Sequence, residues 1–225
     1  MNKFPDTVNN WGEYSYILEE VNSIISNCEW FRIYDIIEAL WKELDLNERK
    51  EFSNQLNDYF NESGIGWKIV SGFIEVRGNE NFERVITKVS NVLISAKLLT
   101  ANEEIKEAIT DLSRRPNPDI TGAIQHSIAC LECVCREVIG NKKATLGELM
   151  KKANGIIPKP LDTAIDKIWG WTSEQGRHLQ EGKEPEYLEA ELVVELSATI
   201  STYLGKKLGR KDTIQINNDE TDLPF

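Results

Sequence analysis

The sequence predicts a mainly α-helical protein with one small β-hairpin in its first third. Three observations support this fold class. Apolar residues recur every three or four positions over most of the chain, which is the spacing of an amphipathic helix. The spacing changes in the segment GIGWKIVSGFIEVRGN, whose β-branched residues and flanking glycines favour short strands. Finally, 40% apolar and 28% charged residues in a chain of 225 are ordinary for a packed core.

The first part of the chain is predicted to form helices over residues 11–62. In WFRIYDIIEALWKEL one apolar stripe contains Ile33, Ile36, Ile37, Leu40, Trp41 and Leu44. The segment LNERKEFSNQLNDYF continues with apolar residues at spacing four, and we expect Asn47 to be its N-cap. A hairpin should then turn around Ser71 and Gly72. Residues 80–112 return to helical spacing.

The middle of the chain begins with SRRPNPDI, residues 113–120, whose two prolines break the helical pattern. We expect a domain boundary near residues 100–116. The next helix carries the stripe Ile124, Ile128, Leu131, Cys135 and Val138, with Gly140 as its C′ residue. Thr145 and Glu148 fit a capping box. Pro160 suits the first turn of a helix that runs to about Trp171.

The last predicted helix is EYLEAELVVELSATISTYLGKKL. Its apolar stripe stacks Leu188, Leu192, Leu196, Thr199 and Tyr203 on one side, and Val193, Ile200 and Leu204 widen that side. Beyond Gly205 the sequence becomes polar. We expect a flexible tail there.

Charge and composition exclude several classes of protein. A net charge of −11 argues against a chain that coats nucleic acid over its whole surface. No apolar run approaches the roughly 18 residues of a membrane span. The start, MNKFPDTVNNWGEY, lacks the apolar region of a secretion signal. The four cysteines are then expected to be reduced thiols of a cytoplasmic protein.

The cysteine cluster CLECVC raises the question of a metal site. A zinc site needs four convergent ligands, and the sequence has no second cysteine pair. On a helix Cys133 and Cys135 point apart, and nothing marks Cys28 or His126 as further ligands. We therefore expect core cysteines, a structural or surface role for His126, and no metal or cofactor.

Arg177 and His178 are the best catalytic candidates, within the stretch GWTSEQGRHLQEG. Histidine exchanges protons near neutral pH, and arginine presents a donor fork that suits phosphate. The alternative is that the two residues simply lie on a turn and have no catalytic role. A locally basic region precedes it, either as a solvated face or as a patch for RNA phosphates. Its lysines are Lys142, Lys143, Lys151, Lys152, Lys159 and Lys167.

Longer segments resemble a known family. Residues 107–204 resemble the C-terminal helical domain of bacterial abortive-infection proteins, of the HEPN-like class, through AITDLSRRPNPDITGAIQHSIACLECVCREVIG, TLGELMKKA, PKPLDTAIDKIWGWTSEQGRH and EAELVVELSATISTYL. The earlier segments WFRIYDIIEALW and IGWKIVSGFIEV resemble the AbiJ-type N-terminal domain. We therefore expect an AbiJ-type α+β domain over 1–106, a HEPN-like helical bundle over 107–208 and a flexible acidic tail over 209–225.

The resemblance implies anti-phage defence. Active HEPN-like members are metal-independent ribonucleases, usually homodimeric, whose arginine and histidine converge across the subunit interface. Their motif places arginine ahead of histidine with four to six residues between, whereas Arg177 and His178 are adjacent. The favoured hypothesis is therefore a non-catalytic defence module that binds a protein partner. The alternatives are a dimeric ribonuclease that uses Arg177 and His178 on RNA, and a sensor of a nucleotide or small ligand.

The C-terminal end, NNDETDLPF, resembles the tip of bacterial single-stranded DNA-binding proteins, which ends in an acidic run and a Pro-Phe pair. In that family the terminal aromatic enters an apolar pocket on repair and replication proteins. The alternative is an ordinary acidic tail. By this resemblance the partner-binding residues are Asp219, Glu220, Asp222, Leu223, Pro224 and Phe225.

Overall fold

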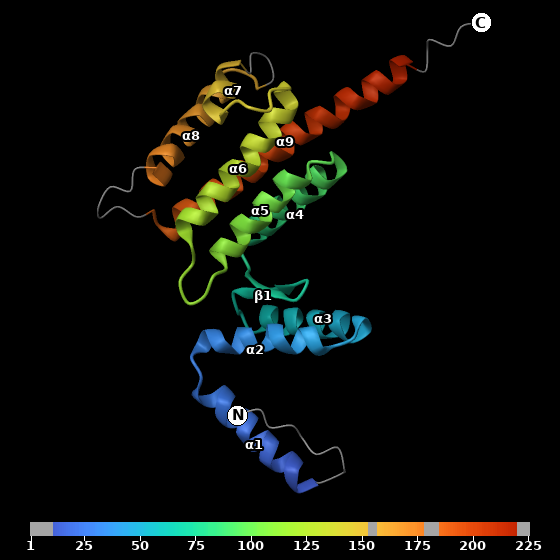
Figure 1. Ribbon diagram of the computed structural model, residues 1–225, viewed down its shortest axis with the longest axis vertical. Helices are drawn as coiled ribbons and strands as arrows, with labels where there is room; N and C mark the ends of the chain where they lie inside the picture. The colour runs from blue at the N-terminus through green and yellow to red at the C-terminus, as the bar shows by residue number, and fades with distance from the viewer. Residues whose placement is uncertain (1–10, 153–156, 178–184, 220–225) are drawn as a thin grey trace, which may run out of the picture. The chain divides into compact units, whose positions relative to one another are not determined.

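The computed structural model describes residues 11–152, 157–177 and 185–219, and the side chains of residues 14–149, 157–172 and 185–209. Within this part of the chain it contains nine helices and one two-stranded hairpin, as Figure 1 shows. The predicted fold class, mainly α with one small hairpin, is confirmed.

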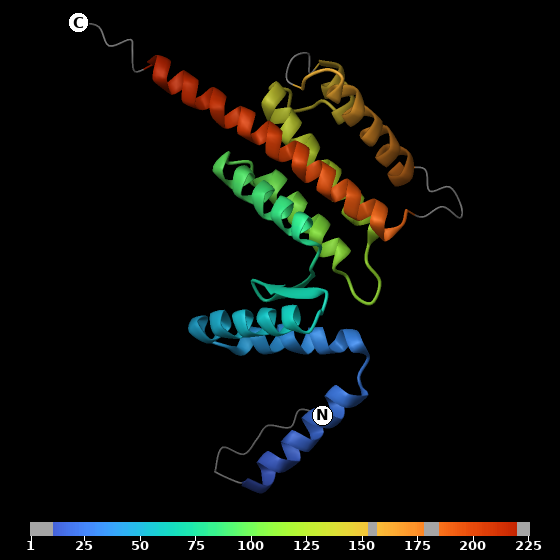
Figure 2. The same cartoon turned by 180° about the vertical axis from the view of Figure 1, so that it is seen from behind.

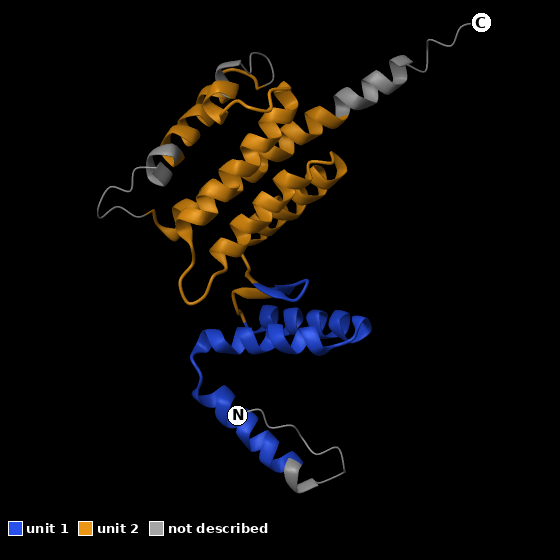
Figure 3. Ribbon diagram, in the orientation of Figure 1, with its two compact units in different colours: residues 1–63, 69–74 blue, residues 64–68, 75–225 orange. Residues whose placement is uncertain are grey.

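The chain divides into two compact units, which Figure 3 colours separately. The first comprises residues 1–63 and 69–74, and the second comprises residues 64–68 and 75–225. The division passes through the hairpin, so that its tip belongs to the first unit and its base to the second. Residue 106, where the sequence analysis ends its first domain, lies inside helix α5 (Leu99–Leu112).

The first unit contains α1 (Trp11–Asn27), α2 (Trp30–Glu43) and α3 (Leu46–Glu62). Asp45, and not the predicted Asn47, is the N-cap of α3. Its carboxylate accepts hydrogen bonds from the backbone N–H groups of Asn47 at 2.8 Å and Glu48 at 3.0 Å, and Glu48 Oε2 accepts from Asp45 N at 2.9 Å. This reciprocal capping box satisfies three backbone N–H groups at the start of the helix, those of Asp45, Asn47 and Glu48.

The hairpin forms where the sequence predicts it, from β1 (Trp67–Val70) and β2 (Phe73–Val76). Ser71 and Gly72 connect the strands with φ values of 52° and 89°, and a two-residue turn with two positive φ angles matches the right-handed twist of paired strands. In the first unit, Asn57 of α3 holds Ile69, because its Oδ1 accepts from Ile69 N at 2.7 Å and its Nδ2 donates to Ile69 O at 3.0 Å.

The second unit is a helical bundle built from α4 (Glu80–Ser95), α5, α6 (Ile120–Ile139) and α9 (Tyr187–Asp219). Figure 2 shows α9 running beside α4 and α6. Two further helices, α7 (Leu146–Lys152) and α8 (Leu161–Arg177), pack against α6. The most deeply buried apolar side chains of this core include Val89, Leu93, Ile105, Leu131, Val134 and Val194.

Two of the predicted helix boundaries of this unit are confirmed. Gly140 follows α6 with φ of 74°, in the left-handed region that glycine adopts without a steric penalty. Thr145 and Glu148 form the predicted capping box, in which Glu148 Oε2 accepts from Thr145 N at 3.0 Å and Thr145 Oγ1 accepts from Glu148 N at 3.4 Å.

The helix α8 extends to Arg177, beyond the predicted end near Trp171. Gly170 does not end the helix, because glycine in a helix interior costs only about 1 kcal/mol relative to alanine. The free energy gained when α8 packs against its neighbours exceeds this cost. Trp169 lies over Gly147 of α7, where an added Cβ would be 2.9 Å from the indole ring.

The buried face of α9 matches the predicted apolar side only in part: Val193 and Leu204, which we expected to widen that side, are buried, whereas the leucines and the tyrosine of the stripe itself are exposed. Leu188, Leu192 and Tyr203 are 70%, 55% and 40% exposed. The bundle instead buries a side with many small residues, and this side includes Ala190, Val193, Val194, Ser197, Ala198, Ser201, Thr202 and Leu204. Small residues occupy the buried face because α9 and α4 approach each other closely. At Gly205, for example, an added Cβ would lie 2.8 Å from Val92 Cγ1 of α4.

The helix α9 continues to Asp219, within the segment for which the sequence predicts a flexible tail. None of the helices in the described part of the chain has a stretch long and apolar enough to cross a membrane.

Candidate functional site

The catalytic and partner-binding residues predicted from the sequence lie at or beyond the ends of the segments that the structure describes. Arg177 is the last residue of α8, and its side chain and His178 lie outside the described residues. Asp219 ends α9, and the tip from Glu220 to Phe225 also lies outside them. The arrangement of the Arg177–His178 pair therefore stays a prediction.

A polar cluster that the sequence did not predict lies where α5 turns into α6. We call it the Asp111–His126 cluster, and its residues are Glu104, Asp111, Arg114, Asp119 and His126. Arg114 bridges two aspartates, at 2.8 Å from Asp111 Oδ1 and 2.9 Å from Asp119 Oδ2. His126 Nδ1 lies 2.8 Å from Glu104 Oε2, and its Nε2 lies 3.7 Å from Asp111 Oδ2.

The electrostatics of this cluster are set by its buried carboxylate. Asp111 is only 1% exposed, whereas Arg114 is 56% exposed and His126 is 40% exposed. Burial raises the pKa of the Asp111 carboxyl, and the Arg114 guanidinium opposes part of that effect. The cluster contains three carboxyl groups and one guanidinium: Arg114 contacts Asp111 and Asp119, and Glu104 contacts His126. The cluster is therefore net negative while His126 is neutral, and it is better suited to a cationic group than to a phosphate.

The local sequence around α6 explains why the cluster forms. Asp119 caps the helix, since its Oδ1 accepts from Gly122 N at 2.8 Å, and its own N–H donates to Asp111 O at 2.9 Å. Gly122 makes room for the buried carboxylate, because a Cβ there would lie 2.5 Å from Asp111 Oδ2. The cluster therefore joins α5 to α6 and also presents a half-exposed histidine.

The raised pKa of Asp111 predicts a specific dependence of stability on pH. An acid that binds its proton more tightly in the folded state contributes stability in full below its ordinary pKa of 3.8, and this contribution is lost as pH rises through the folded-state pKa. We expect the free energy of unfolding of the wild type, minus that of Asp111→Asn, to fall with rising pH over this window and then stay level. Urea unfolding at a series of pH values measures it. A difference that grows with pH would contradict the assignment.

The sequence prediction for two of the cysteines in α6 is confirmed. Cys130 and Cys135 are 0% and 1% exposed and belong to the core. Burial raises the pKa of each thiol to about 12, which keeps both protonated and unreactive at neutral pH. Cys133 is half-buried, and burial raises its pKa too. Among the described residues there is no group of three or more side chains that could hold a metal ion.

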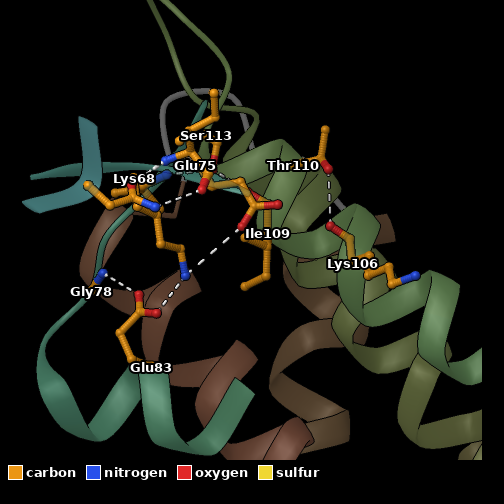
Figure 4. Close-up of polar contacts among 11 residues, drawn as sticks. Lys68, Glu75, Gly78, Glu83, Lys106, Ile109, Thr110 and Ser113 are labelled. Carbon is orange, nitrogen blue, oxygen red and sulfur yellow. Dashed lines mark hydrogen bonds and ion pairs between the residues drawn. The ribbon is translucent and has the colours of Figure 1, made fainter. Parts of the chain in front are cut away.

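A second polar cluster, at the base of the hairpin, is shown in Figure 4. Lys68 Nζ lies 2.5 Å from Glu83 Oε2 and 4.0 Å from Glu75 Oε2. Gly78 N donates to Glu83 Oε1 at 3.1 Å, so that one carboxylate ties the ammonium to the start of α4. Burial raises the pKa of Glu75, and the ammonium of Lys68 lowers it in part. These groups satisfy one another, which gives the cluster a structural role.

A groove of 890 Å³ runs between α4 and α9. Its charged lining mixes both signs, which singles out no class of ligand. The charged residues that line it are Glu80, Glu83, Arg84, Lys88 and Lys206.

The predicted basic region is exposed where its side chains are described. Lys142, Lys143, Lys159 and Lys167 all face solvent, whereas the side chains of Lys151 and Lys152 lie outside the described residues. A solvated face and a phosphate-binding patch both remain consistent with this exposure.

Comparison with known families gives a match for the first part of the chain. Residues 1–91 match the family described as AbiJ N-terminal domain 4. The first 91 residues are thus similar to an AbiJ-type N-terminal domain. The match covers the helices α1 to α3, the hairpin and most of α4, and it supports the predicted abortive-infection family. No curated protein and no solved structure matches the chain.

Downstream of the matched residues 1–91, the Asp111–His126 cluster is the feature that sequence reasoning missed. Two spacings could have indicated it: Glu104 and Asp111 are seven residues apart, as are Asp119 and His126. Residues at that spacing share one face of a helix. What the spacing cannot supply is the antiparallel pairing of α5 with α6 that brings the two faces together.

Proposed function

We propose that this protein acts in anti-phage defence of the abortive-infection type, as a non-catalytic module that binds a protein partner. The match of residues 1–91 to the AbiJ N-terminal domain carries the defence role. In this proposal the AbiJ-type domain spans 1–106, a HEPN-like helical bundle spans 107–208, and the acidic tail of 209–225 supplies the partner-binding residues.

The charge around the described histidine supports a non-catalytic role. RNA cleavage by a HEPN-like mechanism needs a cationic side chain directed at the phosphate beside the proton-transferring histidine. His126, the one histidine in the described part of the chain, faces Glu104 and Asp111, and the nearest guanidinium is bound by two aspartates. Such a site repels a phosphate. The adjacent spacing of Arg177 and His178 supports the same conclusion.

The C-terminal tip supplies the chemistry for partner binding. Phe225 offers apolar area for a pocket, its α-carboxylate can accept a bidentate arginine, and Pro224 limits the freedom lost on docking. Asp219, Glu220 and Asp222 would raise the rate of association in a salt-dependent way.

Competition with a peptide of the last nine residues, NNDETDLPF, tests the partner-binding role. The probe is a repair or replication protein that binds the tip of single-stranded DNA-binding proteins, with that tip as the labelled ligand. We expect the peptide to displace the tip, and the peptide without Phe225 to lose at least about tenfold in affinity, because a buried aromatic contributes more than 1.4 kcal/mol. Equal behaviour of the two peptides would identify the tail as a solubilising end.

An RNA cleavage assay tests the non-catalytic role separately. The full chain, Arg177→Ala and His178→Ala are incubated with RNA in EDTA, and we expect no cleavage by any of the three. Cleavage by the wild type that both substitutions abolish, with unchanged thermal stability, would overturn the proposal in favour of a metal-independent ribonuclease.

A further inference from the structure

The groove between α4 and α9, which we call the α4–α9 groove, is narrow at one glycine of α9 and open at the next. Gly205 packs tightly on α4, since an added Cβ would lie 2.8 Å from Val92 Cγ1. One turn further along α9, Gly209 also lines the groove, but a Cβ there would meet no atom of the described chain within 4 Å. Ala96 lines the groove as well. Beside Gly209 the groove therefore has space for an apolar side chain from another segment.

The pairing of the charged residues gives this groove a basic character that their number alone does not show. Glu83 is already neutralised, because Lys68 Nζ lies 2.5 Å from its Oε2, as Figure 4 shows. Glu80 lies in the first turn of α4, about three turns before Val92. Three cations of the lining form no ion pair with a described residue, and these are Arg84, Lys88 and Lys206. The groove is therefore suited to a segment that combines carboxylates with an apolar side chain.

The residues that follow α9 have this chemistry. Asp219, Glu220 and Asp222 supply carboxylates, and Leu223 and Phe225 supply apolar side chains. An aromatic ring buries a large apolar area, and carboxylates are attracted to unpaired lysine and arginine side chains. The end of the chain is thus complementary to the groove in both charge and hydrophobicity.

The length of this segment allows it to reach the groove within one chain. Helix α9 runs on past the end of α4, as Figure 2 shows, and from Gly209 to Asp219 it is about 15 Å long at 1.5 Å per residue. Residues 220–225 span up to about 20 Å when extended. If they turn back along α9, Phe225 reaches the level of Gly209 and Gly205.

We propose that residues 220–225 fold back onto their own bundle and that Phe225 occupies the open end of the α4–α9 groove. Lys88 and Lys206 then attract the carboxylates beside it. A partner that binds the tip must compete with the groove, so the contact is autoinhibitory for the partner binding proposed above. The docking itself involves only this chain and does not require that partner.

The tether sets the expected occupancy of the groove. A short flexible linker gives an effective concentration on the order of 1 mM, so a tip with an intrinsic dissociation constant of about 0.1 mM is docked about 90% of the time. While the tethered tip is docked, a free peptide of the same sequence has to compete with it. The free peptide should therefore bind the wild-type chain about tenfold more weakly than a chain whose groove is vacant.

Nuclear spin relaxation of the backbone amides tests the docking in the full chain. We expect Leu223 and Phe225 to be ordered in the wild type at every protein concentration. Gly209→Leu fills the groove without a clash and should make both amides mobile. The matched control is Gly170→Leu in α8, where an added Cβ also meets no atom within 4 Å, and it should keep them ordered. Equal mobility in the wild type and Gly209→Leu overturns the proposal. Order that appears only at high concentration also overturns it, because the groove then binds the tail of a second copy.

Binding of a labelled peptide, NNDETDLPF, tests the charge complementarity. We expect it to bind full-length Phe225→Ala about tenfold more tightly than the wild type, and equal affinities overturn the proposal. Adding Lys206→Glu to Phe225→Ala should weaken peptide binding at least about tenfold. Adding Lys143→Glu, at an exposed position outside the groove, should not. Circular dichroism confirms that each variant is folded. The assay contains no repair or replication protein, so its outcome is independent of the test of partner binding.

Discussion

Val194→Asp is expected to unfold the helical unit, whereas Leu192→Asp, two residues earlier, should leave it folded. Val194 is 0% exposed in the middle of the bundle, and Leu192 is 55% exposed. A carboxylate at residue 194 would lose its hydration without a partner, and such burial destabilises proteins by about 4 kcal/mol or more. The same carboxylate at residue 192 stays in water and should change the free energy of unfolding by about 0.5 kcal/mol or less.

Urea unfolding followed by circular dichroism measures both variants. If Leu192→Asp were the variant that unfolds, the predicted stripe of Leu188, Leu192 and Tyr203 would be the core face after all, and the buried face of α9 would be misassigned.

This pair of variants probes the point at which the sequence pattern failed. A count of apolar residues at helical spacing favours the side of α9 with the largest apolar side chains. The bundle instead buries the side rich in alanine and serine, because close helix approach requires small residues, as at Ala198 and Ser201. Periodicity locates an apolar stripe, but it does not show whether the core buries that stripe or leaves it exposed.

Features set by local chemistry were predictable. The turn at Ser71 and Gly72, the left-handed Gly140 and the capping box of Thr145 depend on residues within three positions of one another, and all three are confirmed. The cap of α3 was placed two residues late. Asp45 with Glu48 forms the reciprocal pair that Asn47 cannot form, and this was also visible in the sequence.

Features set by tertiary packing were not predictable in the same way. The Asp111–His126 cluster depends on two helices that meet with opposite directions. Each helix shows its part of the cluster as a seven-residue spacing, yet charged residues at such spacing usually form solvated faces. The burial of Cys130 was predictable, because free cysteine is among the most buried residue types in any fold.

Gly72→Ala is expected to destabilise the first unit by about 2–5 kcal/mol, from two separate causes. Gly72 has φ of 89°, and a side chain in the left-handed region costs about 1–2 kcal/mol. In addition, a Cβ there would lie 2.6 Å from Trp41 Cζ3 and 2.8 Å from Cδ2, and overpacking of this kind costs about 1–3 kcal/mol.

Trp41 cannot move aside easily. Its indole Nε1 donates to Ser53 Oγ at 3.0 Å, and the Arg49 guanidinium lies over the ring at 4.5 Å from its centroid. The first unit also has few fully buried apolar side chains among its described residues, Phe60, Ile69 and Ile74, so it has little stability in reserve. We therefore expect hydrogen exchange of Gly72→Ala to show lost protection in α2, α3 and the hairpin tip, with α6 and α9 still protected.

A matched substitution separates the two causes. Gly64 also has a positive φ, of 66°, but a Cβ there would meet no atom within 4 Å. Gly64→Ala should therefore cost only the conformational part, about 1–2 kcal/mol. The double variant Trp41→Leu with Gly72→Ala provides the second comparison: with the indole removed, adding the Cβ should cost no more than at Gly64. If Gly72→Ala costs the same with and without Trp41, the strain lies in the turn alone, and the indole does not lock the hairpin tip onto α2.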